Sequence, residues 1–196
     1  VARAEAFLWY MFLLSLPIQR RVIVYQATWD FQEWLSFTLY GTDVLFILLL
    51  IATFLRCPQW WKGAIHRYEY LLAAFVAVSA LSIAVSSHPA VSALAVVRLL
   101  EFTAFYWYVS RHALSTFRTI YSLAAFIAGV IIQAVIAVGQ FFVQHNLGLR
   151  TLGESVLSPS MQGVASFYLA SGEKVIRAYG ATPHPNVLAA YLMVGL

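Results

Sequence analysis

Long apolar runs separated by polar stretches dominate the pattern of this chain. The runs are continuous rather than alternating, and several approach the ~20 residues that cross ~30 Å of hydrocarbon as a helix. Because lipid offers no hydrogen-bond partner to the backbone, we expect helices to make the crossings. The predicted fold class is all-α, a polytopic transmembrane helix bundle that forms a single transmembrane domain over residues 1–196. Five full spans are expected at about 6–25, 37–55, 70–85, 90–108 and 119–143, and a sixth starts at 185.

Aromatic side chains mark both ends of the second predicted span. Trp34 and Tyr40 lie at its start, and Trp60 and Trp61 follow its end. Aromatic rings prefer the headgroup level of a bilayer, so their placement supports these boundaries.

The polar stretch 144–184 is predicted to be an outer loop with a short helix of its own. Ser158 followed by Pro159 is typical of a helix start, and Gly172 is suited to ending that helix. Apolar residues between them recur at spacings of three and four, namely Leu157, Met161, Val164, Ala165 and Tyr168. This pattern predicts an amphipathic helix lying on the membrane surface.

Composition excludes an ordinary soluble domain. Hydrophobic residues make up 62% of the chain and charged residues 10%, against about 25% charged in soluble proteins. The net charge of +4 is spread along the sequence, so no nucleic-acid partner is expected. The single cysteine, Cys57, cannot form an internal disulfide, and the five histidines show no metal-ligand spacing. We therefore expect no metal and no cofactor.

Basic residues in short loops indicate the orientation of the spans. The loops after the second and fourth spans are basic, with Arg56, Lys62, Arg67, Arg111 and Arg118. Placing these loops inside puts the N-terminus inside and the 144–184 loop outside. Arg20 and Arg21 then lie outside, which argues against this orientation.

A polar strip before the sixth span, residues 177–186, contains the best candidate for a functional site. The Arg177 guanidinium presents a planar fork suited to phosphate oxygens, and Gly180 has no side chain to block close approach. Pro183 and Pro185 stiffen the backbone, and Pro185 also suits the first position of a helix, whose free N–H groups favour an anion. Together these features predict a phosphate or pyrophosphate site at the outer membrane face. The alternative is a loop arginine on lipid headgroups beside an ordinary helix start.

His184 and Asn186 lie within the same strip. The imidazole of His184 is a candidate general base, phosphate donor or helix cap. Asn186 could orient a ligand or its own backbone. Both are predicted to contribute to substrate binding.

Two further polar pairs lie within predicted spans. Arg98 and Glu101 share a helix face deep in the fourth span, where charges usually face a polar interior. They form either an ion pair that locks the bundle or the base of an outward-facing cavity in which Arg98 binds the substrate. Gln133 and Gln140 share one face of the fifth span and either line this cavity or hydrogen-bond between helices.

The strip also resembles a known family. Arg177-Ala178-Tyr179-Gly180 followed by His184-Pro185-Asn186 and an apolar helix is similar to the O-antigen ligase and polymerase family of bacterial membrane proteins. Leu152-Gly153-Glu154 and the Arg98-Leu99-Leu100-Glu101 segment are similar to that family as well. The resemblance is strongest over about 150–196 and looser over the earlier spans.

This resemblance implies a multi-pass glycosyltransferase of the bacterial inner membrane, active in lipopolysaccharide and cell-envelope biosynthesis. Such enzymes move a glycan from an undecaprenyl-pyrophosphate carrier to a lipid or glycan acceptor at the periplasmic face, without metal or nucleotide. By match to the motif, Arg177 is the catalytic residue that holds the pyrophosphate and stabilises the leaving group. We expect the chain to be the front part of a longer protein, inactive alone, with the catalytic base beyond Leu196.

Two other classes of function remain open. Buried Arg98 and Glu101 and the proline-rich breaks are also typical of a multi-span transporter of a small or anionic solute. A non-catalytic assembly protein would tolerate loss of Arg177.

Overall fold

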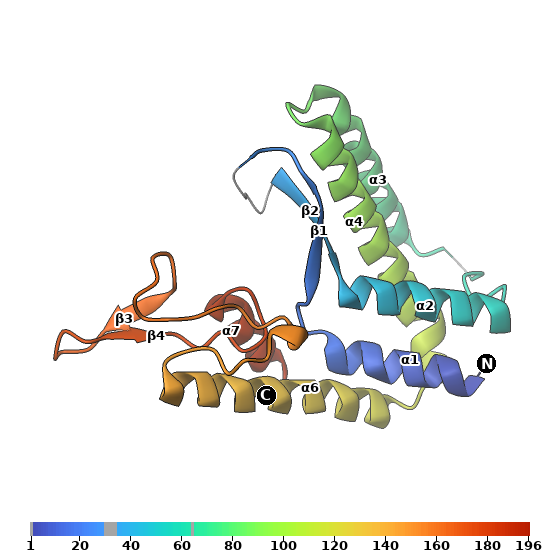
Figure 1. The fold of residues 1–196 in the computed structure, drawn as a ribbon. Helices are drawn as coiled ribbons and strands as arrows, with labels where there is room; N and C mark the ends of the chain where they lie inside the picture. Colours follow the sequence, from blue (N-terminus) through green and yellow to red (C-terminus); the bar gives the residue numbers. More distant parts are fainter. Residues whose placement is uncertain (1, 30–34, 64) are drawn as a thin grey trace. The chain divides into compact units, whose positions relative to one another are not determined.

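The computed structural model describes residues 2–29, 35–63 and 65–196 of a mostly helical chain (Figure 1). It divides into two compact units. Unit 1 comprises Val1–Glu5, Val22–Leu39 and Phe46–Arg118, and unit 2 comprises Ala6–Arg21, Tyr40–Leu45 and Thr119–Leu196. Each unit is described by itself.

Three helices within the described residues are long and apolar enough to cross a membrane. They are Arg67–Val85, Pro89–Thr116 and Thr119–Val143. They correspond to the predicted spans at 70–85, 90–108 and 119–143, and the middle helix continues beyond its predicted end. The prediction of five full spans is wrong for the described residues, because the first two predicted spans each contain a strand and a shorter helix.

The predicted span 6–25 breaks at Pro17. Helix α1, Ala2–Ser15, stops before this proline, which has no N–H to continue a helix. Strand β1, Arg21–Gln26, follows, and its Val-Ile-Val-Tyr core is typical of a strand. A 14-residue helix at 1.5 Å per residue is about 21 Å long and does not span ~30 Å of hydrocarbon.

The predicted span 37–55 begins with strand β2, Ser36–Tyr40, which pairs with β1. Helix α2, Gly41–Arg56, follows and has 16 residues. The Tyr40 amide donates to the Asp43 carboxylate at 2.8 Å, which fixes the helix start. Trp34, the aromatic marker of this span, lies outside the described residues.

Unit 1 is built around a helical hairpin. Helix α3, Arg67–Ser82, extends into a 3₁₀ turn at Ile83–Val85, and α4, Pro89–Tyr108, returns alongside it (Figure 1). A π-helical turn at Val109–Ala113 and the short α5, Leu114–Thr116, continue the same rod. Large apolar side chains such as Leu71, Phe75 and Val78 are exposed on α3, as expected of a surface solvated by lipid.

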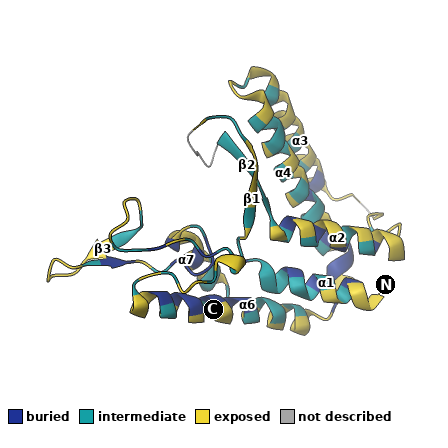
Figure 2. Cartoon of the chain, in the orientation of Figure 1, coloured by how far each residue is buried: buried dark blue, intermediate teal, exposed yellow. Residues whose placement is uncertain are grey.

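Unit 2 is organised by the 25-residue helix α6, Thr119–Val143, which matches the predicted span end for end. Its buried residues lie on one face, at Gly129, Val130, Gln133, Ile136, Ala137 and Gln140. Figure 2 shows this buried stripe beside exposed residues on the same helix. The second half of α1 packs along α6, where the Trp9 indole donates to the Ser122 hydroxyl at 2.9 Å. Gly129 permits this packing, since a Cβ there would lie 2.6 Å from the Leu14 carbonyl oxygen.

The loop 144–184 contains a hairpin in place of the predicted amphipathic helix. Strands β3, Ser166–Tyr168, and β4, Lys174–Ile176, pair antiparallel, with Phe167 opposite Val175. Gly163, inside the predicted helix, has a positive φ angle of 79°, which a helix does not accommodate, and Gly172, with 83°, lies between the two strands. A 3₁₀ turn, Arg150–Leu152, precedes the hairpin, and helix α7, Pro185–Val194, starts at the predicted residue.

Candidate functional site

The predicted anion site lies in unit 2 on a short segment, residues 177–186, that we call the strip. It leaves strand β4 at Ile176 and ends in the first turn of α7. The Arg177 amide donates to the Ala165 carbonyl at 2.9 Å, and the Ala165 amide donates to the Tyr179 hydroxyl at 2.8 Å. Leu157, Ile176 and Tyr179 form a small apolar core beneath this end of the strip. The start of the strip is therefore fixed to the loop fold.

Gln140 of α6 holds the middle of the strip. Its side-chain oxygen accepts from the amides of Tyr179 and Gly180 at 3.0 and 2.8 Å. Its amide group donates to the Gly180 carbonyl at 2.9 Å and to the Glu154 carboxylate at 2.8 Å. Gln140 is fully buried, so four hydrogen bonds satisfy both ends of a side chain that would be costly to bury alone.

Gln133, two turns earlier on the same face, holds the next residue. Its side-chain oxygen accepts from the Ala181 amide at 2.8 Å, and both residues are fully buried. Its Nε2 group is buried without a hydrogen-bond partner among the described residues. The two glutamines thus bond to the strip, which fits neither the predicted cavity lining nor the predicted bonding between helix side chains.

Gly180 belongs to this scaffold and does not lie open to a ligand. The residue is buried, and its φ of +61° lies in the left-handed region that favours glycine. A Cβ would collide with the side-chain oxygen of Gln133. The close approach predicted for a substrate is made by the protein's own side chain.

His184 is the N-cap of α7. Its backbone is extended, with φ −152° and ψ 143°, as expected of a residue before proline, and Pro185 occupies the first turn. The Nδ1 atom accepts from the Asn186 amide at 3.2 Å, so a neutral ring carries its proton on Nε2. The amides of Val187 and Leu188 donate to the His184 carbonyl at 3.0 and 3.2 Å. The expected open amides of this helix start are therefore already satisfied.

Arg177 lies against this capped helix start. Its Nη2 atom donates to the Asn186 side-chain oxygen at 3.0 Å, and both residues are exposed. Within the described part of the chain, the guanidinium makes no other hydrogen bond or ion pair. The helix dipole adds partial positive charge at the same place. The remaining guanidinium donors, the Asn186 amide group and the His184 Nε2–H form a surface with the chemistry to bind an anion.

Arg98 lies in unit 1 and its donors are used within the protein. Its Nη1 atom pairs with the Glu101 carboxylate at 2.6 Å, and its Nη2 atom donates to the Thr38 carbonyl at 2.6 Å. The guanidinium also lies over the Phe37 ring, 5.3 Å from its centroid. Of the two alternatives for this pair, the internal ion pair is the one present, and substrate binding by Arg98 stays a prediction.

Glu154 has a structural role that the sequence did not assign, although Leu152-Gly153-Glu154 is part of the family resemblance. Its carboxylate is buried and accepts from the amides of Leu147 and Leu149 at 2.6 and 2.5 Å, besides Gln140. It fixes the turn after α6 and orients the glutamine that holds the strip. Its place directly after Gly153, whose φ is +90°, is the one local signal of a specified turn.

The described residues contain no group of three His, Cys, Asp or Glu side chains placed to hold a metal ion. Comparison with protein-family models, curated proteins and solved structures found no match to this chain. The geometry of the strip is therefore the basis of the functional argument.

Proposed function

We propose that this protein transfers a glycan from a polyprenyl-pyrophosphate carrier to a lipid or glycan acceptor at the periplasmic face of the bacterial inner membrane. The observation that carries the proposal is the exposed, uncompensated Arg177 guanidinium, held at the start of α7 by Asn186. Gln140, in the last turn of the 25-residue apolar helix α6, holds the strip, so the strip suits a ligand that is itself anchored in the membrane. The motif's resemblance to the O-antigen ligase and polymerase family supports the same assignment.

In this reaction an acceptor hydroxyl attacks the anomeric carbon of the donor glycan. A new glycosidic bond forms as the bond between that carbon and the phosphate oxygen breaks. The polyprenyl pyrophosphate leaves with the electron pair, and the hydroxyl proton passes to a base. Negative charge on the leaving group grows in the transition state, where a fixed guanidinium stabilises it more than in the ground state.

The other residues of the strip have supporting roles in this proposal. Asn186 aligns the Arg177 fork and offers its own amide to a phosphate oxygen. His184 in its capping tautomer presents Nε2–H, so it acts as a donor and not as the base. Gly180 and the two glutamines hold the backbone that carries these groups.

Substitution of Arg177 by lysine tests the proposal in the intact protein. Arg177→Lys keeps the charge but loses the planar fork, and we expect glycan transfer to fall by about 10²- to 10³-fold. The assay follows the loss of polyprenyl-pyrophosphate-linked glycan and the gain of modified acceptor in membranes. Arg67→Lys, at an exposed arginine of unit 1, is the matched control and should leave transfer unchanged. Near-normal transfer by Arg177→Lys would overturn the assignment.

A transporter of a small or anionic solute is the second candidate. The observation in its favour is the set of charged pairs within the helices of unit 1, such as Arg98 with Glu101. Uptake of an anion into proteoliposomes that depends on Arg98 and not on Arg177 would favour it. Glycan transfer that depends on Arg177 and persists in Arg98→Gln would exclude it.

A further inference from the structure

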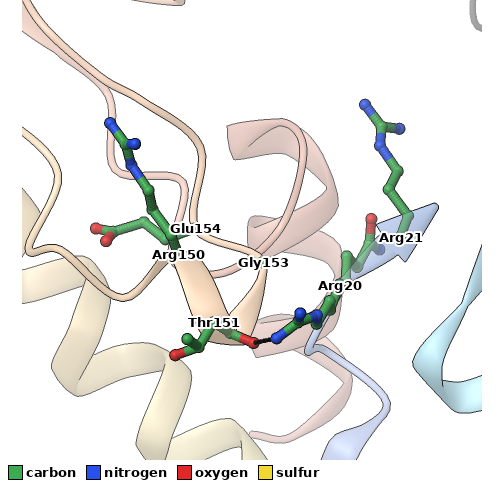
Figure 3. Close-up of a pocket in the computed structure, with 7 residues that line it drawn as sticks. Arg20, Arg21, Arg150, Thr151, Gly153 and Glu154 are labelled. Atoms are coloured by element: carbon green, nitrogen blue, oxygen red, sulfur yellow. Dashed lines mark hydrogen bonds between the residues drawn. The ribbon is translucent and has the colours of Figure 1, made fainter. Parts of the chain in front are cut away.

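A cationic pocket separate from the strip lies in unit 2, where the segment after α1 meets the turn after α6 (Figure 3). Its volume is about 390 Å³, within the range of small-ligand pockets. Gln19, Arg20, Arg21, Arg150, Thr151, Gly153 and Glu154 line it. Three of these seven residues are arginines, contributed by two segments far apart in the sequence.

The meeting of the two segments is specified by their backbones. Gly153 has a positive φ, and a Cβ on it would lie 2.6 Å from the Arg20 amide nitrogen. Only glycine permits this approach, which brings Arg20 and Arg150 to the same pocket. The Arg20 Nη1 atom donates to the Thr151 carbonyl at 3.2 Å, and the Gln19 amide donates to the Ala181 carbonyl at 3.3 Å.

The pocket's three arginines outnumber its one carboxylate. Glu154 is the one acidic residue among the pocket's lining residues, and its oxygens accept from Leu147, Leu149 and Gln140. In the part of the chain that the structure describes, the exposed Arg150 guanidinium has no hydrogen-bond or ion-pair partner. Figure 3 shows Arg150 and Arg21 extending from opposite segments, with Arg20 turned toward Thr151.

We propose that this pocket is a second anion site and that it takes a phosphate group. Guanidinium forks match phosphate oxygens in shape and charge, and exposed backbone polar groups can complete the ligand shell. The turn that carries Arg150 begins seven residues after the end of α6, so a membrane that α6 crosses would have one face near the pocket. The phosphate belongs to a lipid headgroup or to a soluble phosphate-bearing molecule. The site stands on its own geometry and does not depend on the transferase proposal.

A binding experiment on the full chain tests the pocket and identifies the source of the phosphate. All measurements use an Arg177→Gln background, so that phosphate held by the strip does not count. Retention of phosphatidylglycerol is compared with retention of phosphatidylcholine by native mass spectrometry of protein released from mixed-lipid nanodiscs. Arg20→Gln with Arg150→Gln should lower phosphatidylglycerol affinity about 10-fold, since each lost guanidinium removes a charge-assisted hydrogen bond. Arg67→Gln removes an exposed arginine outside the pocket and should change it little.

The second arm titrates inorganic phosphate and pyrophosphate against the same variants in a zwitterionic detergent. Phosphate binding that the double variant loses and Arg67→Gln keeps supports a soluble ligand, and loss confined to phosphatidylglycerol supports a headgroup. Equal binding by all variants in both arms, or equal losses in Arg67→Gln and the double variant, overturns the proposal. Arg150→Gln alone guards against misfolding, because its guanidinium has no protein partner to lose.

Discussion

The two units of this chain differ in how their arginines pair with carboxylates. In unit 1, carboxylates pair with three helix arginines: Glu5 with Arg56, Glu69 with Arg111, and Glu101 with Arg98, whereas Arg67 is exposed. In unit 2, the exposed arginines Arg20, Arg150 and Arg177 have no carboxylate partner within the described residues. The polar side chains buried in unit 2 are Gln133, Gln140, Thr182 and two carboxylates, Asp43 and Glu154, that accept from backbone amides.

This difference separates structural charges from charges available to a ligand. An ion pair inside a helix bundle fixes the packing but leaves little net field for a substrate. Glutamine can hold a backbone segment without adding charge, so the guanidinium groups nearby keep their full field. The contrast predicts that unit 1 loses stability when its charges change, and that unit 2 loses stability when its glutamines change.

Gln140→Leu is expected to give the largest effect. The change removes four hydrogen bonds and leaves the buried amides and carbonyl of residues 179–180 unsatisfied. Each unsatisfied buried group costs about 1–3 kcal/mol, so we expect a loss of about 3–5 kcal/mol in unfolding free energy. Denaturant unfolding in detergent micelles measures it. Phe142→Leu, an exposed position on the same helix, is the control. A loss below about 1 kcal/mol would show that the strip does not depend on this glutamine.

Glu5→Gln is the equivalent change in unit 1. Glu5 is fully buried, pairs with the Arg56 guanidinium, and accepts from Thr53 at 2.9 Å and from His112 at 2.6 Å. Removing its charge leaves the Arg56 guanidinium uncompensated. Because the Arg56 side chain is 32% exposed, we expect about 2–4 kcal/mol rather than the full cost of a buried unpaired charge. Thermal unfolding reports the loss, and Glu173→Gln on the exposed hairpin should be neutral.

Gln133→Leu should cost less than Gln140→Leu, about 1 kcal/mol. It leaves the buried Ala181 amide without an acceptor, but it also removes the Nε2 group that has no partner among the described residues. The same unfolding assay compares the two. A loss of unfolding free energy as large as that of Gln140→Leu would contradict the smaller role predicted for Gln133.

Arg177→Gln and Arg150→Gln should have the smallest effect on stability, within about 0.5 kcal/mol of the parent. Neither guanidinium has an ion-pair partner in the described residues, so folding gains little from its charge. Arg111→Gln is the matched comparison, because it breaks the pair with buried Glu69 at 2.7 Å. Similar losses for all three variants would contradict the division between paired and ligand-binding arginines.

Sequence reasoning succeeded where a signal was long or strictly local. The uninterrupted apolar run of 119–143 predicted α6 at its observed bounds, and Pro185 after an extended His184 predicted the start of α7. The prediction that residues 22–25 continue the first helical span was wrong, because a short apolar stretch fits a strand or a helix equally well. The spacing of apolar residues from Leu157 to Tyr168 predicted a helix that is absent, because Gly163 within it has a positive φ.

In the candidate site too, contacts within one motif were predictable and contacts between distant segments were not. Arg177 and Asn186 are nine residues apart and share one motif, so their proximity was accessible from the sequence. Gln140 and Gly180 are 40 residues apart, and helical periodicity identifies a shared face without saying what packs against it. The convergence of Arg20 with Arg150 was missed for the same reason, since only the folded backbone at Gly153 brings them together.

The hydrogen bonds between Gln140 and Gly180 also have a consequence for the order of folding. Residues 179–181 can reach their final conformation only after α6 is in place, so the strip should order late during synthesis. The loop between α6 and the strip then serves mainly to connect them. Closure entropy rises slowly with loop length, at about 0.6 kcal/mol for each doubling, so small insertions at the exposed Ser171 should delay this ordering little.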